Sequence, residues 1–167
     1  LYAGRKVALG SGIYTAAGNY ADDLYLMAEE SLVLEGQVNF ENPADGQTRV
    51  VLMSGGTLDA NPGGTGAVSF STAVSDLVMT ARETISLKDV SLEVGANLYL
   101  ESLSDLILEG GFLSSSDLLS LRGSGLEAKT FVYVWPEYCV VLALNVGLNA
   151  DFSPVGIHQF HRLGVGL

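Results

Sequence analysis

This chain has little cysteine and little positive charge. Among its 167 residues there is one cysteine, Cys139, and there are 8 lysines and arginines against 19 aspartates and glutamates. A single cysteine can build neither an intramolecular disulfide framework nor a thiolate metal cluster. Because Cys139 lies in an apolar run without a neighbouring cation, we expect an inert thiol in the core.

The shortage of cations excludes whole classes of partner. The formal net charge is −11. Binding to nucleic acid needs a basic face that displaces counterions from phosphates, and a few scattered cations cannot build one. Attachment to anionic membrane surfaces is disfavoured for the same reason. We therefore expect no nucleic-acid partner.

Long apolar runs are missing as well. The most apolar stretch, residues 138–144, is preceded by Pro136 and interrupted by Asn145, so it falls far short of the roughly 20 residues that span a bilayer. The sequence predicts no membrane span. A hydrophobic content of 48% with only 16% charged residues nevertheless predicts a packed core, and 20 glycines suit many short strands joined by tight turns.

What the chain does contain is a repeated pattern of two short strands. Apolar residues alternate with others, and each alternating segment is followed eight residues later by a second one. The period of two places the apolar side chains on one face of each strand and excludes an amphipathic helix. Three copies keep the interval, at Leu24 and Leu32, Leu77 and Ile85, and Leu98 and Leu106; looser copies begin at Val50 and Leu119.

The spacing of the units predicts an all-β fold, a single-stranded parallel β-helix (β-solenoid) of about five coils. One unit cannot bury its inner face alone, whereas coils stacked about 4.8 Å apart share a continuous core. A β-sandwich or antiparallel barrel is the alternative, but neither requires a constant interval between paired strands. The stacked register would place Leu77, Met79, Ile85 and Leu87 directly over Leu98, Leu100, Leu106 and Leu108, with Lys88 and Glu109 paired on the outside.

The ends of the units have their own pattern. The first strand of most units closes with a small residue, which allows a corner without crowding the interior: Ala28, Ser54, Ala81 and Ser102. Short polar residues stand just before the units, where we expect them to bond their own backbone in turns: Asp23, Asp76, Asn97 and Asp117. Insertions at 41–46 and 61–66 follow the second strands, so we expect them to project side by side from one edge.

The most regular stretch, residues 76–111, resembles the degenerate repeats of filamentous-haemagglutinin-type exoproteins and related autotransporter passengers. The resemblance covers residues 22–128 and rests on the pattern of hydrophobicity. It implies a right-handed parallel β-helix that is exported across a bacterial envelope and works as an adhesin or surface fibre. It brings no catalytic motif with it.

The chain divides into three parts on this basis: an N-terminal lead-in with a partial coil (residues 1–21), the solenoid repeats (22–129) and a C-terminal segment (130–167) that caps the solenoid or forms a subunit interface. An exposed strand edge pairs with other chains unless it is covered. The C-terminal segment alternates aromatic and aliphatic residues, and we expect the assembly interface at Phe131, Tyr133, Trp135, Tyr138, Val140 and Leu142.

The carboxylates are the residues of this sequence that could carry out enzymatic chemistry. Glycoside hydrolysis needs two carboxylates that face each other across a sugar. Glu29, Glu83 and Glu101 stand near outward positions, with Asp59 or Asp89 as companions. A carbohydrate-active enzyme, a polysaccharide hydrolase or lyase on a β-helix scaffold, is therefore the alternative function. Outward carboxylates on a solenoid are normally only solvated, so we predict no catalytic residues.

The remaining candidates indicate no cofactor and no metal site. His158 and His161 lack the Cys, Asp or Glu partners that would complete a zinc site. The sequence therefore predicts a secreted or cell-surface structural or adhesive protein, not an enzyme. We expect self-association through the solenoid ends and the C-terminal segment, and a cell-surface glycan or protein as a further partner.

Overall fold

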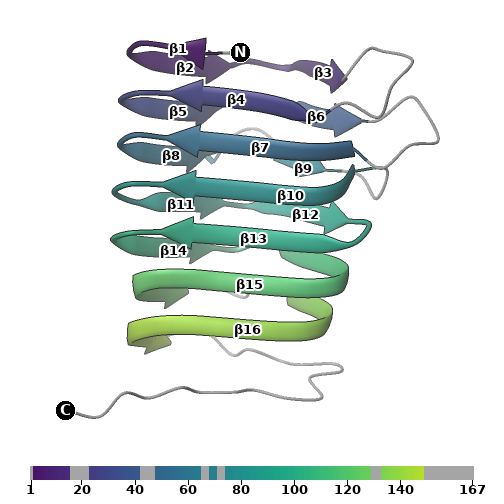
Figure 1. Cartoon of the computed structure of the whole chain (residues 1–167), viewed down its shortest axis with the longest axis vertical. Coiled ribbons are helices and arrows are strands. Elements are labelled where there is room, and N and C mark those ends of the chain that lie inside the picture. The colour runs from purple at the N-terminus through teal and green to yellow at the C-terminus, as the bar shows by residue number, and fades with distance from the viewer. Residues whose placement is uncertain are drawn as a thin grey trace.

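The computed structural model describes residues 2–15, 23–41, 48–64, 68–70, 74–128 and 133–148. These residues form 16 β-strands, paired in parallel, and no helix. In Figure 1 the nearer strands run to the left and the farther ones to the right while the chain descends from its N-terminus, which makes the coil right-handed. The predicted parallel β-helix is confirmed.

Each coil has three strands, which build three faces of the solenoid. The first face contains β1 (Tyr2–Ala3), β4 (Leu24–Ala28), β7 (Thr48–Ser54), β10 (Val74–Ala81) and β13 (Asn97–Ser102). The second face contains β2 (Lys6–Leu9), β5 (Ser31–Leu34), β8 (Thr57–Ala60), β11 (Ile85–Lys88) and β14 (Asp105–Glu109). The third contains β3 (Gly12–Thr15), β6 (Val38–Glu41), β9 (Val68–Phe70) and β12 (Val90–Val94).

Two long strands continue the coil beyond these. β15 (Phe112–Ala128) and β16 (Tyr133–Leu148) bend around the corners and contribute to all three faces in turn. β16 pairs with β15 in parallel from Tyr133 to Leu148, with one irregularity between Ser115 and Leu118. The parallel stacking therefore extends into the segment that was predicted to cap the solenoid or form an interface.

The register of the stack agrees with the predicted one at every pair. Leu77 pairs with Leu98 and Met79 with Leu100 on the first face. On the second face, the predicted pairs Ile85–Leu106 and Leu87–Leu108 are formed too. Lys88 Nζ lies 3.7 Å from Glu109 Oε1 on the outside, as the register required.

The core consists of columns of aliphatic side chains, and each coil contributes one side chain to each column. Val50, Leu77 and Leu98 follow one another in one column of the first face, and each is buried. Burial of a leucine side chain is worth about 1.5–3 kcal/mol relative to exposure. Since each coil meets only its neighbours, this burial is repeated down the stack and holds adjacent coils together.

The corner between the first and second faces is a ladder of backbone hydrogen bonds. The small residues Ala28, Ser54, Ala81 and Ser102 stack there as predicted. The amide of the residue that follows each one donates to a carbonyl one coil above: Gly55 to Ala28 at 2.8 Å, Arg82 to Ser54 at 3.1 Å and Leu103 to Ala81 at 3.1 Å.

One coil turns this corner with two glycines because nothing larger fits. A Cβ atom on Gly55 would stand 2.0 Å from the carbonyl oxygen of Glu29, and one on Gly56 would stand 2.1 Å from that of Glu30. Backbone atoms cannot move aside as the end of a flexible side chain does. The close approach of two coils therefore requires glycine at both positions.

At the corner that leads into the first face, polar side chains bond from coil to coil. The expectation that they would bond their own backbone is wrong for Asp76, whose Oδ1 accepts from the Asn97 side chain at 2.8 Å and from the Asn97 amide at 3.2 Å. Arg49 lies between the carboxylates of Asp76 (3.5 Å) and Asp23 (4.0 Å). Stacking therefore places equivalent turn residues of adjacent coils within bonding distance of one another.

The third strand of each coil was not predicted from the sequence, and it changes where the insertions lie. The insertion at 41–46 follows β6 and leaves the coil before the first face, whereas the one at 61–66 follows β8 and precedes β9. They belong to different corners, so the expectation of a shared edge is wrong. Residues 42–47 and 65–67 themselves lie outside the described part of the chain.

The leucine columns lead to a test with a matched control. Leu100→Ala and Leu108→Ala should each lower the free energy of unfolding by about 2–5 kcal/mol, since both side chains are buried and each truncation leaves a cavity. Leu103→Ala, at a corner position that is 67% exposed, should change it by no more than about 0.5 kcal/mol. Urea denaturation measures all three. Equal losses at the three positions would contradict the inward assignment.

A second test concerns the corner glycines. Gly55→Ala should destabilise the protein by about 1–3 kcal/mol, because the added methyl group meets the backbone of the coil above. Gly10→Ala is the matched control, since its Cβ would meet nothing within 4 Å, and it should stay within about 1 kcal/mol of the parent chain. Thermal unfolding of both variants decides the matter; an unaffected Gly55→Ala would disprove the steric argument.

Candidate functional site

The outer surface of the first face carries stacked apolar side chains in its N-terminal coils. In one column Tyr2 pairs with Met27 and Met27 with Met53. In the neighbouring column the in-register residues are Tyr25, Val51, Val78 and Tyr99. We call the two columns together the apolar face; it consists of Tyr2, Tyr25, Met27, Val51, Met53, Val78 and Tyr99.

Four large side chains of the apolar face are open to solvent. Tyr2 is 63% exposed, Tyr25 44%, Met27 37% and Met53 36%. Single exposed apolar residues are ordinary, but a contiguous group on adjacent strands marks a site of interaction. The flat sheet presents this group on one surface.

Carboxylates hold two of the tyrosines at the edges of this face. The Tyr25 hydroxyl donates to Asp23 Oδ2 at 2.9 Å, and the Tyr2 hydroxyl donates to Glu29 Oε1. These hydrogen bonds, together with the negative charge of each carboxylate, raise the pKa of both phenols. These hydrogen bonds restrain the orientation of the two rings.

The apolar face ends in a charged pair toward the C-terminal coils. The column of Met27 and Met53 continues through Thr80 to Glu101 and Arg122. Arg122 Nη1 lies 3.2 Å from Glu101 Oε1. The apolar surface is therefore concentrated on the first coils.

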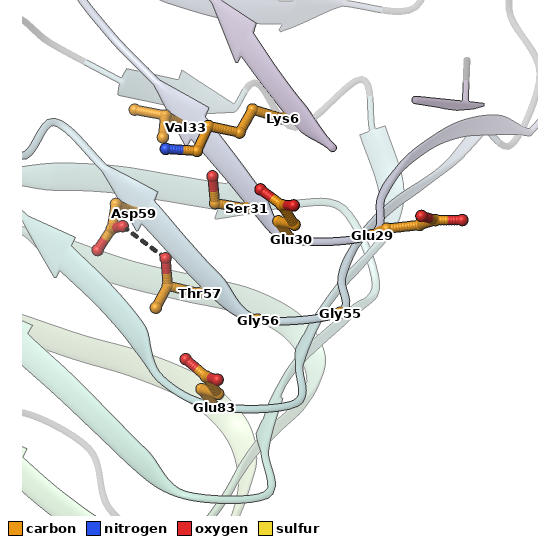
Figure 2. Close-up of a pocket in the computed structure, with 10 residues that line it drawn as sticks. All are labelled: Lys6, Glu29, Glu30, Ser31, Val33, Gly55, Gly56, Thr57, Asp59 and Glu83. Carbon is orange, nitrogen blue, oxygen red and sulfur yellow. Dashed lines mark hydrogen bonds between the residues drawn. The ribbon is translucent and has the colours of Figure 1, made fainter. Parts of the chain in front are cut away.

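An open depression of ≈ 570 Å³ lies at the corner where the first face turns into the second. The corner glycines Gly55 and Gly56 contribute no side chains there, which leaves space between the coils above and below. Figure 2 shows the residues that line it: Lys6, Glu29, Glu30, Ser31, Val33, Gly55, Gly56, Thr57, Asp59 and Glu83. We call it the acidic depression, because it holds four carboxylates and one lysine.

The carboxylates of the depression do not all point the same way. Glu30, Asp59 and Glu83 lie on one side of the corner, whereas Glu29 projects to the other (Figure 2). Thr57 Oγ1 donates to Asp59 Oδ2 at 3.0 Å, and Glu29 accepts from Tyr2. The turn at Glu29 and Glu30 thus offers one carboxylate to the apolar face and one to the depression.

The carboxylates predicted as enzyme candidates are only partly brought together. Glu29, Asp59 and Glu83 line the depression, but two of the three are engaged with neighbours as just described. Glu101 is paired with Arg122, and Asp89 stands in a turn with a φ of 49° between β11 and β12. Sequence reasoning missed Glu30, which reaches the same depression.

The predicted interface residues occupy the last described coil. Phe131 lies outside the described residues, as do His158 and His161. The others pair along β15 with residues whose side chains are not buried: Tyr133 with Phe112, Trp135 with Ser114, Tyr138 with Leu118, Val140 with Ser120 and Leu142 with Arg122. Cys139 pairs with Leu119, a buried member of a core column.

The solenoid has an open edge at each end of its described part. β1, β2 and β3 pair only with β4, β5 and β6 of the following coil. At the other end β16 pairs with β15 alone among the described strands. All of these strands run parallel, so the two edges present complementary halves of the same hydrogen-bonding pattern.

Two further observations limit the chemistry within the described ranges. No group of three or more His, Cys, Asp or Glu side chains there is arranged to hold a metal ion. No helix in that part of the chain has the length and apolar character needed to cross a membrane.

Comparison with known proteins adds no family to this geometry. No protein-family model matches the chain, and neither a curated protein nor a solved structure matches it significantly. The function has to be argued from the fold and its surfaces.

The hydrogen bond at the edge of the apolar face can be tested by titration. Asp23→Asn removes the carboxylate that raises the pKa of Tyr25, so this pKa should fall toward its ordinary value of about 10. The pKa of Tyr2 should not move, because Glu29 raises it independently. Tyrosine-resolved NMR titration separates the two phenols. An unchanged Tyr25 would show that Asp23 is not its partner.

Proposed function

We propose that this chain is a secreted or cell-surface structural and adhesive protein whose solenoid presents rigid outer faces and assembles head to tail. The observation that carries the proposal is the pair of parallel edges that no other described strand covers, β1 to β3 at one end and β16 at the other. Location at the surface rests on the resemblance of residues 22–128 to exported β-helix repeats.

The geometry of the stack explains how copies would join. A second copy displaced along the solenoid axis would bring its β1 and β2 below residues 138–148 of β16, with the strand direction and spacing of about 4.8 Å that already hold the coils together. Such a contact uses different surfaces on the two partners and does not close on itself. It therefore propagates into a filament.

The composition of β16 supports an outer cover for this strand. Residues 138–144 are apolar at successive positions, including those that pair with the outward Ser120 and Arg122. Alternation is normal for a strand with one face in water, whereas a continuous apolar run is typical of a strand covered on both faces. Such cover would act on the outer face of β16, in addition to the edge contact that joins copies head to tail.

Charge favours joining unlike ends over like ones. Residues 1–21 contain Arg5 and Lys6 and not one of the 19 carboxylate side chains. The described C-terminal strands contain Asp117, Glu127 and Glu137 against Arg122. Opposite charge at the two ends directs a head-to-tail encounter and opposes head-to-head contact.

The adhesive part of the proposal is supported by the apolar face. Exposed Tyr2 lies on the edge strand β1, and exposed Tyr25, Met27 and Met53 lie on the adjacent strands β4 and β7. A filament of such coils would repeat this face along its length, and repetition raises the strength of attachment through multivalency.

Two truncations test assembly. The full chain should form filaments in negative-stain electron microscopy, and the chain lacking residues 130–167 should remain folded by circular dichroism but form none, because the apolar terminal strand β16 is gone. The chain lacking only 149–167 keeps β16 and is the matched control, so it should still assemble.

Two results would contradict the proposal. One is a full chain that stays strictly monomeric in analytical ultracentrifugation at every concentration. The other is the same filament from the chain without residues 130–167, which would place the contact elsewhere.

A further inference from the structure

We propose that the apolar face and the acidic depression together form a docking surface for a cationic, apolar segment of another protein. This deepens the adhesive half of the proposed function by assigning a class of partner to the face. The inference rests on two neighbouring surfaces that share one turn, Glu29 and Glu30.

The apolar face supplies the area for contact. Met27 and Met53 stand one above the other at its edge nearest the depression, and Tyr2 continues their column. Methionine side chains adapt to apolar partners of varied shape, and tyrosines held by hydrogen bonds lose little freedom on binding. This combination suits the side chains of a peptide segment.

Charge identifies which kind of segment. The ion pairs of the described residues engage Asp23, Asp76, Glu101 and Glu109 with Arg49, Arg122 and Lys88. In that part of the chain Glu29, Glu30 and Glu83 have no ion-pair partner, although Lys6 also lines the depression. Lysine or arginine side chains of a partner would find three carboxylates beside the apolar contact.

The same charge argues against a second copy of this chain on the face. Each copy carries a formal net charge of −11, and like charges across an interface oppose association. A basic partner would be attracted by the same negative charge.

The size of the face sets the length of the segment. From β1 to β13 the face covers four intervals between coils, about 19 Å at about 4.8 Å each. An extended segment of about six residues or a helix of about 13 residues covers this distance.

The experiment uses the full chain and a fluorescein-labelled amphipathic peptide of 14 leucines and lysines, as about 13 helical residues span the face, with binding measured by fluorescence anisotropy. The variant Met27→Ser/Met53→Ser should weaken binding about tenfold or more, because it removes the apolar centre. Glu30→Gln/Glu83→Gln should weaken it as well and flatten its dependence on salt.

The control is a charge-matched pair away from the docking surface. Glu35→Gln/Glu93→Gln removes two exposed carboxylates, one after β5 and one on β12 of the third face, and should leave binding unchanged. Circular dichroism and thermal unfolding confirm that each variant is folded. All three substituted proteins should still form filaments, so a failure of docking is distinguishable from a failure of assembly.

Several outcomes would overturn the inference. Undiminished binding by either test variant, or equal binding of a peptide with glutamate in place of lysine, would remove the chemical basis for it. Concentration-dependent dimerisation that Met27→Ser/Met53→Ser abolishes would assign the face to a second copy. Binding on a glycan array that Tyr25→Ala abolishes would assign it to a sugar.

Discussion

Parallel pairing of each coil with the next, residue for residue, is the interaction on which the rest of this structure depends. It satisfies the backbone of every strand between its two neighbours and, at the same time, stacks equal positions into columns. Leu77 over Leu98 in the core, Asp76 beside Asn97 at one corner and Lys88 beside Glu109 outside are three results of one register. In one coil the glycines at 55 and 56 follow from it too, because a Cβ atom at either position would meet the backbone carbonyl of the coil above.

The parts of the fold that could be predicted from sequence are those where alternation is strong and the spacing is constant. The first and second strands of a unit qualify, and their register followed directly from Leu77, Leu98, Ile85 and Leu106. The third strand did not. β9 has only three residues, and β6 has only Val38 and Phe40 as apolar positions, so nothing distinguishes either from a turn. Because the third strands were not predicted, the insertions were assigned to the wrong corner. The final coil at β16 was not predicted either, because its aromatic residues differ from the leucines of the preceding coils.

The candidate site divides in the same way. Tyr25, Met27 and Met53 stand at the outward positions of strands whose inward positions were correctly predicted. The apolar face could therefore have been predicted from the same alternation, although it was not. The acidic depression was not accessible to such reasoning. Glu30 and Glu83 lie in the coils on either side of the one that turns on glycines, and both line the depression at that corner. Because the depression lies where two glycines have no side chains, no residue pattern in the sequence indicates it.

The distribution of charge along the stack has a consequence for molecules in solution. With Arg5 and Lys6 in the first coil and the carboxylates of the described residues in later ones, the solenoid of Figure 1 has an electric dipole moment along its long axis. Two such molecules exert torque on each other at distances of about a Debye length, near 10 Å in 0.1 M salt, and rotate toward a common direction before they touch. Ionic strength would then govern how fast they find one another, independently of how firmly they hold once joined.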